Sequence, residues 1–285
     1  MSDAGDTPFD LDHLRTWIGR ETTADDVLTA DLVRKYRATL DLAGDDPQAG
    51  DAAPALIHFC LAQPAAPTAT LGEDGHPARG GFLPPVPLPR RMWAGGGLEF
   101  HGPLRVGDVV RRASKILDVT AKEGRSGLLC FATVEHVISV EGQAMVTERQ
   151  DIVYRGADTG GGAGKAPPAA EAGAHQRIID PSAPLLFRYS ALTFNGHRIH
   201  YDRPYTTGIE GYPGLVVHGP LQAAMLIAFA TELRGNTPKR FDFRSQSPLY
   251  DTAPMVLNAS EQDGGLTLWT ARPDGPIAMK AEATW

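Results

Sequence analysis

Residues 219–233 read Gly-Pro-Leu-Gln-Ala-Ala-Met-Leu-Ile-Ala-Phe-Ala-Thr-Glu-Leu, a segment that is apolar around nearly its whole circumference when wound as a helix. Such a helix must be covered on most of its surface by other elements. A curved antiparallel sheet folded around one long helix provides that cover. We therefore expect a central helix in this segment, wrapped by a sheet.

Alternating apolar and polar runs, typical of strands, occur in two groups along the chain. The first group occupies 98–101, 108–119, 127–140 and 144–154, and the second occupies 240–244, 253–260, 266–272 and 276–285. Short turns between successive strands predict antiparallel pairing. A helix region precedes each group, and the earlier one, over 29–40, can be capped by Thr29 or Asp31. The pattern predicts an α+β protein of two halves, with two antiparallel sheets each wrapped around a central helix.

Two segments rich in Gly, Pro and Ala separate these groups. The segment 64–97 has too few amide donors for regular structure, and its embedded apolar residues predict an ordered surface loop. Arg90 and Arg91 within it are candidate contacts for an anion. The segment 157–176 is expected to be a linker. The predicted domains are therefore 1–156 and 177–285.

Charge and composition exclude several classes of function. The 27 basic and 34 acidic residues give a net charge of −7, which does not favour nucleic-acid binding. No apolar run reaches the roughly 18–20 residues of a membrane span. The acidic start of the chain lacks the features of a secretory signal, so a cytoplasmic location is expected. The two cysteines, Cys60 and Cys130, lie among apolar residues and are expected to be buried thiols.

A polar cluster lies directly before the apolar helix. It reads Arg188-Tyr-Ser-Ala-Leu-Thr-Phe-Asn195-Gly-His197-Arg198-Ile-His200-Tyr-Asp202 and continues as Gly211-Tyr-Pro-Gly-Leu-Val-Val-His218-Gly219. Histidines and amides at this density indicate a site, although each also has a structural explanation. A buried histidine is often a hydrogen-bonded core residue, and Asn before Gly often occupies a turn in the left-handed conformation. His-x-x-His without a nearby acidic or Cys pattern is a weak ligand signal, so we expect no metal.

The segment 189–200 resembles the hydratase motif of the MaoC-like, (R)-specific enoyl-thioester hydratase, hotdog family. The segment 211–220 resembles the Gly-rich entry of that family into its long helix. The chain is most similar to the double-hotdog branch with mesaconyl-C4-CoA (3-methylfumaryl-CoA) hydratase, itaconyl-CoA hydratase and type 2 3-hydroxyacyl-thioester dehydratases. The resemblance implies a double hotdog with a degenerate amino-terminal and a catalytic carboxy-terminal half. It implies hydration or dehydration of an enoyl-CoA without a cofactor, CoA being part of the substrate.

The resemblance also assigns roles to the motif residues. His200 would serve as base and then as acid, since imidazole titrates near neutral pH. The amide of Gly219, at a helix amino terminus, would polarise the thioester carbonyl. Where the family usually has Asp, this chain has Asn195, which can hold a water but cannot take its proton. Either His200 acts alone, or His197 or Asp202 assists it.

Further residues are expected to bind the substrate. An acyl carboxylate would pair with Arg198. The phosphates of CoA would need basic partners, and the candidates are Arg90, Arg91, Lys239 and Arg240. The region 38–47 of the first half has no histidine before His58, so one active site per chain is expected. The complete set of predicted substrate contacts is Tyr189, His197, Arg198, His218, Arg90 and Arg91.

Three other functions compete with the hydratase. They are a 3-hydroxyacyl-ACP dehydratase of fatty-acid synthesis, a hotdog thioesterase and a non-catalytic acyl-CoA-binding subunit. A homodimer is a further expectation.

Overall fold

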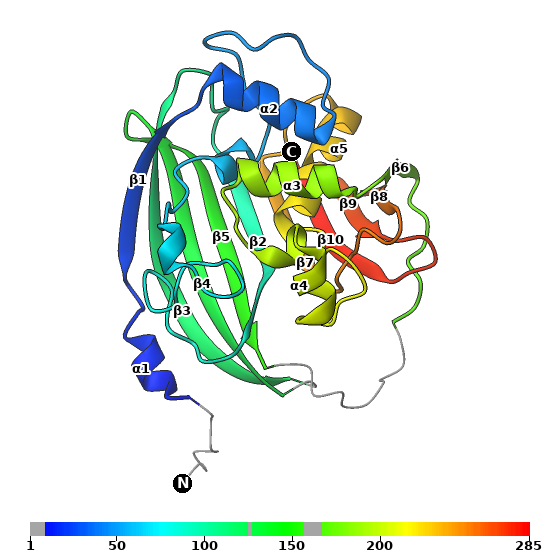
Figure 1. The fold of residues 1–285 in the computed structure, drawn as a ribbon. Coiled ribbons are helices and arrows are strands. Elements are labelled where there is room, and N and C mark those ends of the chain that lie inside the picture. The colour runs from blue at the N-terminus through cyan, green and yellow to red at the C-terminus, as the bar shows by residue number, and fades with distance from the viewer. Residues whose placement is uncertain (1–8, 125–126, 157–166) are drawn as a thin grey trace.

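A single antiparallel sheet forms the frame of the protein (Figure 1). The computed structural model describes residues 9–124, 127–156 and 167–285. Within these ranges the ten strands lie in the order β1-β3-β4-β5-β2-β7-β10-β9-β8-β6, and every neighbouring pair is antiparallel. The strands are β1 (Glu21–Val27), β2 (Arg90–Phe100), β3 (Val109–Gly124), β4 (Gly127–Val140), β5 (Gln143–Arg155), β6 (His175–Ile179), β7 (Arg240–Ser245), β8 (Met255–Gln262), β9 (Gly265–Ala271) and β10 (Ile277–Thr284).

The described residues also form five α-helices. They are α1 (Leu11–Arg15), α2 (Ala30–Leu40), α3 (Ala183–Leu192), α4 (Arg203–Gly208) and α5 (Gly219–Arg234), with 3₁₀ turns at Ile57–Cys60, Thr68–Thr70 and Arg198–His200. Among the helices in the described ranges, none combines the length and apolar character that crossing a membrane requires.

The expected central helix is α5. It packs against β7, β8, β9 and β10, and the side chains of Leu221, Leu226 and Ile227 are completely buried. Burial of one such side chain stabilises a fold by about 1.5–3 kcal/mol. Gly235 ends the helix in the left-handed conformation, at φ 78°, where glycine has no steric penalty. The sheet of the second half therefore wraps α5 as its sequence predicts.

The first half differs from expectation because, among its described residues, no long helix lies inside the sheet. The predicted helix over 29–40 is confirmed as α2, and the Thr29 side chain accepts a hydrogen bond from the amide of Leu32. However, α2 packs beside α3 (Figure 1) rather than within the sheet. The segment 64–89 before β2, called the Pro-rich loop below, instead contributes Val86 to a second apolar core, together with Ile116 of β3. Apolar side chains of this loop thus replace those of a helix.

The two expected sheets are one continuous sheet, which is a second correction. The pairing of β2 with β7 joins the halves. This also corrects the prediction that Arg90 to Gly97 is a loop, because these residues form most of β2. A Cβ atom at Gly95 would lie 2.6 Å from the carbonyl oxygen of Phe243, and one at Gly96 would lie 2.5 Å from that of Arg149. The glycines that suggested a loop allow the close approach of neighbouring strands.

The predicted linker is only partly within the described residues, since 157–166 lie outside them. The last two residues of its predicted range, His175 and Gln176, begin β6 and pair with β8. The domain boundaries remain a prediction. Cys130 is buried and Cys60 partly so, and both are free thiols.

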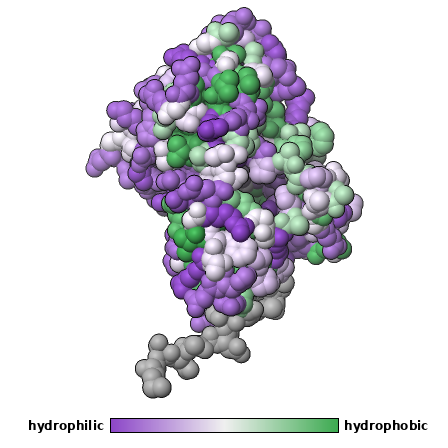
Figure 2. All heavy atoms as spheres, turned by 90° about the vertical axis from the view of Figure 1, so that its left-hand side faces the viewer, coloured by the Kyte–Doolittle hydropathy of each residue, from purple (hydrophilic) through white to green (hydrophobic). Residues whose placement is uncertain are grey.

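The edge strand β1 is exposed along its whole length. Its acidic side chains pair with basic ones on β3: Asp25 lies 2.9 Å from Arg111, and Glu21 lies 2.9 Å from Lys115. Figure 2 shows this face as mostly hydrophilic, with scattered hydrophobic patches. Charged side chains on an edge strand oppose pairing with another chain.

The junction between the halves provides a test of the single sheet. Gly95→Ala places a methyl group against the Phe243 carbonyl, so we expect the free energy of unfolding to fall by about 2 kcal/mol or more. Gly208→Ala, where a Cβ atom would meet nothing within 4 Å, is the matched control and should leave stability nearly unchanged. Urea unfolding followed by circular dichroism measures both. Equal midpoints for the two variants would contradict the close approach.

Candidate active site

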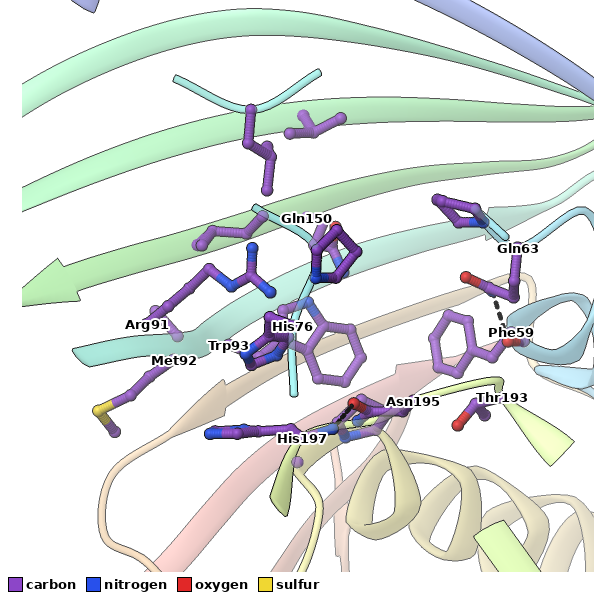
Figure 3. A pocket seen from close by; sticks show the side chains of 18 of the residues that line it. Phe59, Gln63, His76, Arg91, Met92, Trp93, Gln150, Thr193, Asn195 and His197 are labelled. Carbon is purple, nitrogen blue, oxygen red and sulfur yellow. Dashed lines mark hydrogen bonds between the residues drawn. The ribbon is translucent and has the colours of Figure 1, made fainter. Parts of the chain in front are cut away.

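A cavity of about 760 Å³ lies between the two halves. Its wall combines the Pro-rich loop, the strands β2 to β5, the polar motif before α5 and the first residues of α5 (Figure 3). Cavities of this size accommodate a cofactor-sized ligand. Residues of both halves line this cavity.

His200, in the 3₁₀ turn before α4, is part of the cavity wall and is only 7% exposed. Its Nδ1 atom lies 2.7 Å from the carbonyl oxygen of Val216. Since a carbonyl only accepts, Nδ1 carries the hydrogen and Nε2 keeps its lone pair. Burial lowers the pKa of His200 to about 4. The side chain is thus a neutral base at physiological pH.

His218 packs against the ring of His200. The two rings stack with centroids 3.6 Å apart, and the Nε2 atom of His218 lies 2.8 Å from the hydroxyl of Ser190. Burial lowers the pKa of His218 well below its usual value, and His200 and His197 lower it further. Unlike His200, His218 is outside the cavity lining, so the structure does not place it as a substrate contact.

The start of α5 and the side chain of Tyr189 present donors to the cavity. Gly219 is the first residue of α5, where amides lack partners within the helix. A Cβ atom at Gly219 would lie 3.2 Å from the ring of Trp93, so glycine keeps the passage to this amide open. Tyr189 is fully buried, and its hydroxyl has no hydrogen-bond partner among the described residues.

Asn195 lines the cavity but also organises its own turn. Its Oδ1 atom accepts a hydrogen bond of 3.0 Å from the amide of His197. The residue before it, Phe194, has φ 49°. The side-chain oxygen of Asn195 therefore bonds to the backbone of a turn, but the left-handed residue of that turn is Phe194 and not Asn195 as the turn interpretation predicts.

His197 is in ring contact with two other histidines. Its ring centroid lies 5.4 Å from that of His200 and 4.1 Å from that of His76, a residue of the Pro-rich loop (Figure 3). The Nδ1 atom of His76 lies 2.9 Å from a carboxylate oxygen of Asp74. Burial lowers the pKa of His197, and the neighbouring His76 and His200 lower it further. Three histidines thus follow one another along the wall.

Asp74 is the carboxylate of this group. Burial raises its pKa, but the hydrogen bond and charge of His76 outweigh that effect, so the pKa stays below its usual value. Burial lowers the pKa of His76 against the opposing effect of Asp74. Asp74, His76 and His197 have ligand atoms within 4.8 Å of one another and are the described residues best placed to hold a cation.

Sequence reasoning missed His76, and a signal was available. The run Gly72-Glu-Asp-Gly-His76 places an acid and a histidine in a Pro-rich loop that is otherwise poor in them. An ordered loop of this length often carries function. Only the folded chain shows that this loop contacts the motif.

The predicted basic contacts divide into two groups. Arg91 lines the cavity, whereas Arg90 does not and lies 3.8 Å from Glu210. Arg198 forms an ion pair of 2.7 Å with Asp202 and is likewise outside the lining.

Asp202 also caps α4, so its carboxylate already has two partners. Lys239, just before β7, and Arg240, its first residue, are exposed and away from the cavity lining, and Arg240 pairs with Asp242 and Glu99. Of the predicted residues, the cavity brings together Tyr189, Asn195, His197, His200, Gly219 and Arg91.

The opposite wall, from the first half, is polar as well. His136 of β4 lies 2.7 Å from the hydroxyl of Ser114, and its pKa is lowered to about 4 by burial. His58 lies 3.4 Å from the buried carboxylate of Glu148. The first half thus retains ionisable groups at the cavity, although it has no copy of the motif.

Comparison with known proteins places this geometry in a family. A family model described as hydroxyacyl-thioester dehydratase type 2 matches residues 55–251. The chain belongs to this family. Mesaconyl-C(4)-CoA hydratase of Chloroflexus aurantiacus is 45% identical to it over 269 residues, which cover 93% of this chain and 95% of the relative.

Solved structures agree on the fold of the family. HtdX of Mycobacterium tuberculosis superposes with a TM-score of 0.65 at 21% identity, covering 93% of this chain and 99% of that protein. A second M. tuberculosis protein, described as having a double hotdog fold, superposes with a TM-score of 0.53 at 14% identity, covering 94% and 96%. The predicted family, the α+β double-hotdog fold and the hydro-lyase class are confirmed.

The protonation state of His200 provides a test of the site. A base must be neutral to accept a proton, and the pKa of His200 is lowered to about 4. Hydratase kcat/KM should therefore stay high as the pH falls below 6.5 and decline only near pH 4, because this ratio reports the free enzyme. Rate assays at pH values from 3.5 to 8 measure the profile, after a check that the protein stays folded at each pH. An acid limb centred near 6.5 would contradict a buried, neutral His200.

Proposed function

We propose that the protein adds water to, or removes it from, a short branched enoyl-CoA whose acyl group carries a carboxylate, as in mesaconyl-C4-CoA. One observation carries the proposal: the unprotonated Nε2 atom of buried His200 and the first turn of α5 belong to the same cavity. The 45% identity to a mesaconyl-C(4)-CoA hydratase supports the choice of acyl group.

The geometry supports a single proton cycle. The thioester carbonyl accepts hydrogen bonds at the start of α5, where the amide of Gly219 and the helix dipole stabilise negative charge. His200 takes a proton from water while the water oxygen bonds to Cβ. The π electron pair moves towards the thioester oxygen. The imidazolium of His200 then gives its proton to Cα.

A carboxylate on the acyl group needs a cationic partner beside the reacting carbons. Arg198, which the sequence suggested, is already paired with Asp202. Arg91 lines the cavity, and its charge is close enough to lower the pKa of both His76 and His197. Figure 3 shows Arg91 and His76 next to each other in the cavity. We therefore assign the acyl carboxylate to Arg91.

All bonds in this cycle change by proton transfer and carbon–oxygen bond formation, so the proposed reaction requires no redox group. The homodimer, the cytoplasmic location and the absence of a cofactor remain predictions.

His200 provides the direct test of the reaction. His200→Ala should lower kcat for hydration by about 10²–10⁴-fold, the usual contribution of a positioned proton-transfer group. A panel of crotonyl-, mesaconyl-, itaconyl- and long-chain enoyl-CoA, followed by loss of the conjugated thioester absorbance, measures turnover. His175→Gln, at an exposed position on β6, is the control. Unchanged turnover in His200→Ala, or release of free thiol by the wild type, would refute a hydratase.

Arg91 provides a test of the acyl group. Arg91→Gln should lower kcat/KM for mesaconyl-C4-CoA by about 10–100-fold, because a hydrogen bond to a charged group is lost. Hydration of crotonyl-CoA, which has no second carboxylate, should change by less than about threefold. Arg240→Gln, on the exposed part of β7, controls for the loss of positive charge. Equal losses for both substrates would instead assign Arg91 to the part of the substrate that they share.

A further inference from the structure

The proposed proton cycle uses one base of the motif, His200, where the chemistry benefits from two groups. A water between catalyst and substrate has two hydrogens, and His200 can receive only one of them. The oxygen of Asn195 already accepts a hydrogen bond from the His197 amide, and its amide nitrogen is only a donor. Asp202 pairs with Arg198 and accepts from the amide of Tyr205, and it is not part of the cavity lining. His197 lines the cavity, and an acceptor from another part of the chain lies directly beside it.

The Pro-rich loop brings such an acceptor to the motif. The amide of Arg198 donates a 2.9 Å hydrogen bond to the carbonyl of Asp74. Backbones touch at Gly75 and Gly196, and Gly75 adopts φ +85°. A Cβ atom at Gly75 would lie 1.9 Å from the carbonyl oxygen of Gly196, so no other residue fits. This contact places His76 directly against His197.

The hydrogen bond to Asp74 fixes which nitrogen of His76 is basic. A carboxylate only accepts, so the Nδ1 atom of His76, 2.9 Å from Asp74, carries the hydrogen. The Nε2 atom then keeps its lone pair. A histidine with its Nδ1–H held by a carboxylate, here the half-buried Asp74, is oriented as a proton acceptor, and positive charge that develops on it is stabilised.

We propose that His76, oriented by Asp74, is a second catalytic residue that takes the place of the carboxylate missing at Asn195. This inference rests on the proposed hydratase function. The attacking water gives one proton to Nε2 of His200 and donates its other hydrogen, as a hydrogen bond, to Nε2 of His76. The oxygen–Cβ bond forms as the π pair moves to the thioester oxygen, and His200 returns its proton to Cα. The product hydroxyl keeps the hydrogen that His76 held.

Asp74→Asn and His76→Gln test the pair. Asn can donate to Nδ1 of His76 and so favours the tautomer whose Nε2 carries hydrogen, which cannot accept from water. We expect kcat to fall by about 10²-fold or more in both variants. The dissociation constant of a saturated acyl-CoA that cannot react should change by less than about threefold. His175→Gln serves as the histidine control, and thermal unfolding of each variant verifies the fold.

Three outcomes would overturn the inference. In the first, kcat of both variants stays within threefold of the wild type while His200→Ala is inactive. In the second, kcat falls together with binding of the unreactive thioester, which assigns the pair a structural role. In the third, a chelator abolishes wild-type activity and zinc restores it, which assigns Asp74, His76 and His197 to a metal. Inactivity of the wild type on every thioester would refute the proposed hydratase as well, and is distinguishable from all three.

Discussion

Burial of α5 is the constraint on which the other features depend. The helix has no wide polar face, and Leu221, Leu226 and Ile227 are completely buried. Its cover comes from β7 to β10, which curve around it. Because the helix is enclosed along its length, its amino terminus has a fixed position beside Trp93 of β2. A helix start inside a protein, with a glycine as its first residue, offers oriented amides to whatever enters the cavity.

Burial also determines the protonation state of the histidines. Burial lowers the pKa of His200 to about 4 and also lowers those of His197 and His218. Each imidazole is therefore available in its neutral form at physiological pH. Hydrogen bonds then decide which nitrogen of each ring is basic: His200 donates to the backbone of Val216, and His76 donates to Asp74. Oriented neutral bases beside the start of α5 suit the addition of water to an activated double bond.

The two halves of the chain contribute unequally to the cavity. The second half supplies the motif and the helix start, while the first supplies Arg91, the polar wall around Glu148 and the loop with His76. Pairing of β2 with β7 holds these contributions in register, because glycines in β2 allow its neighbours to approach closely. The first half, which has no copy of the motif, therefore still contributes side chains to the cavity.

The sequence by itself determined the α+β class, the helix α5, the strand groups and the cluster around His200, because each leaves a local pattern of apolar spacing or of residue type. Tertiary structure alone decided the rest. Pairing of β2 with β7 joins residues about 140 positions apart, which no local pattern records. The same holds for His76, which reaches His197 through the backbone contact of Gly75 with Gly196. Contacts between distant segments depend on how the whole chain packs, and local sequence carries little information about them.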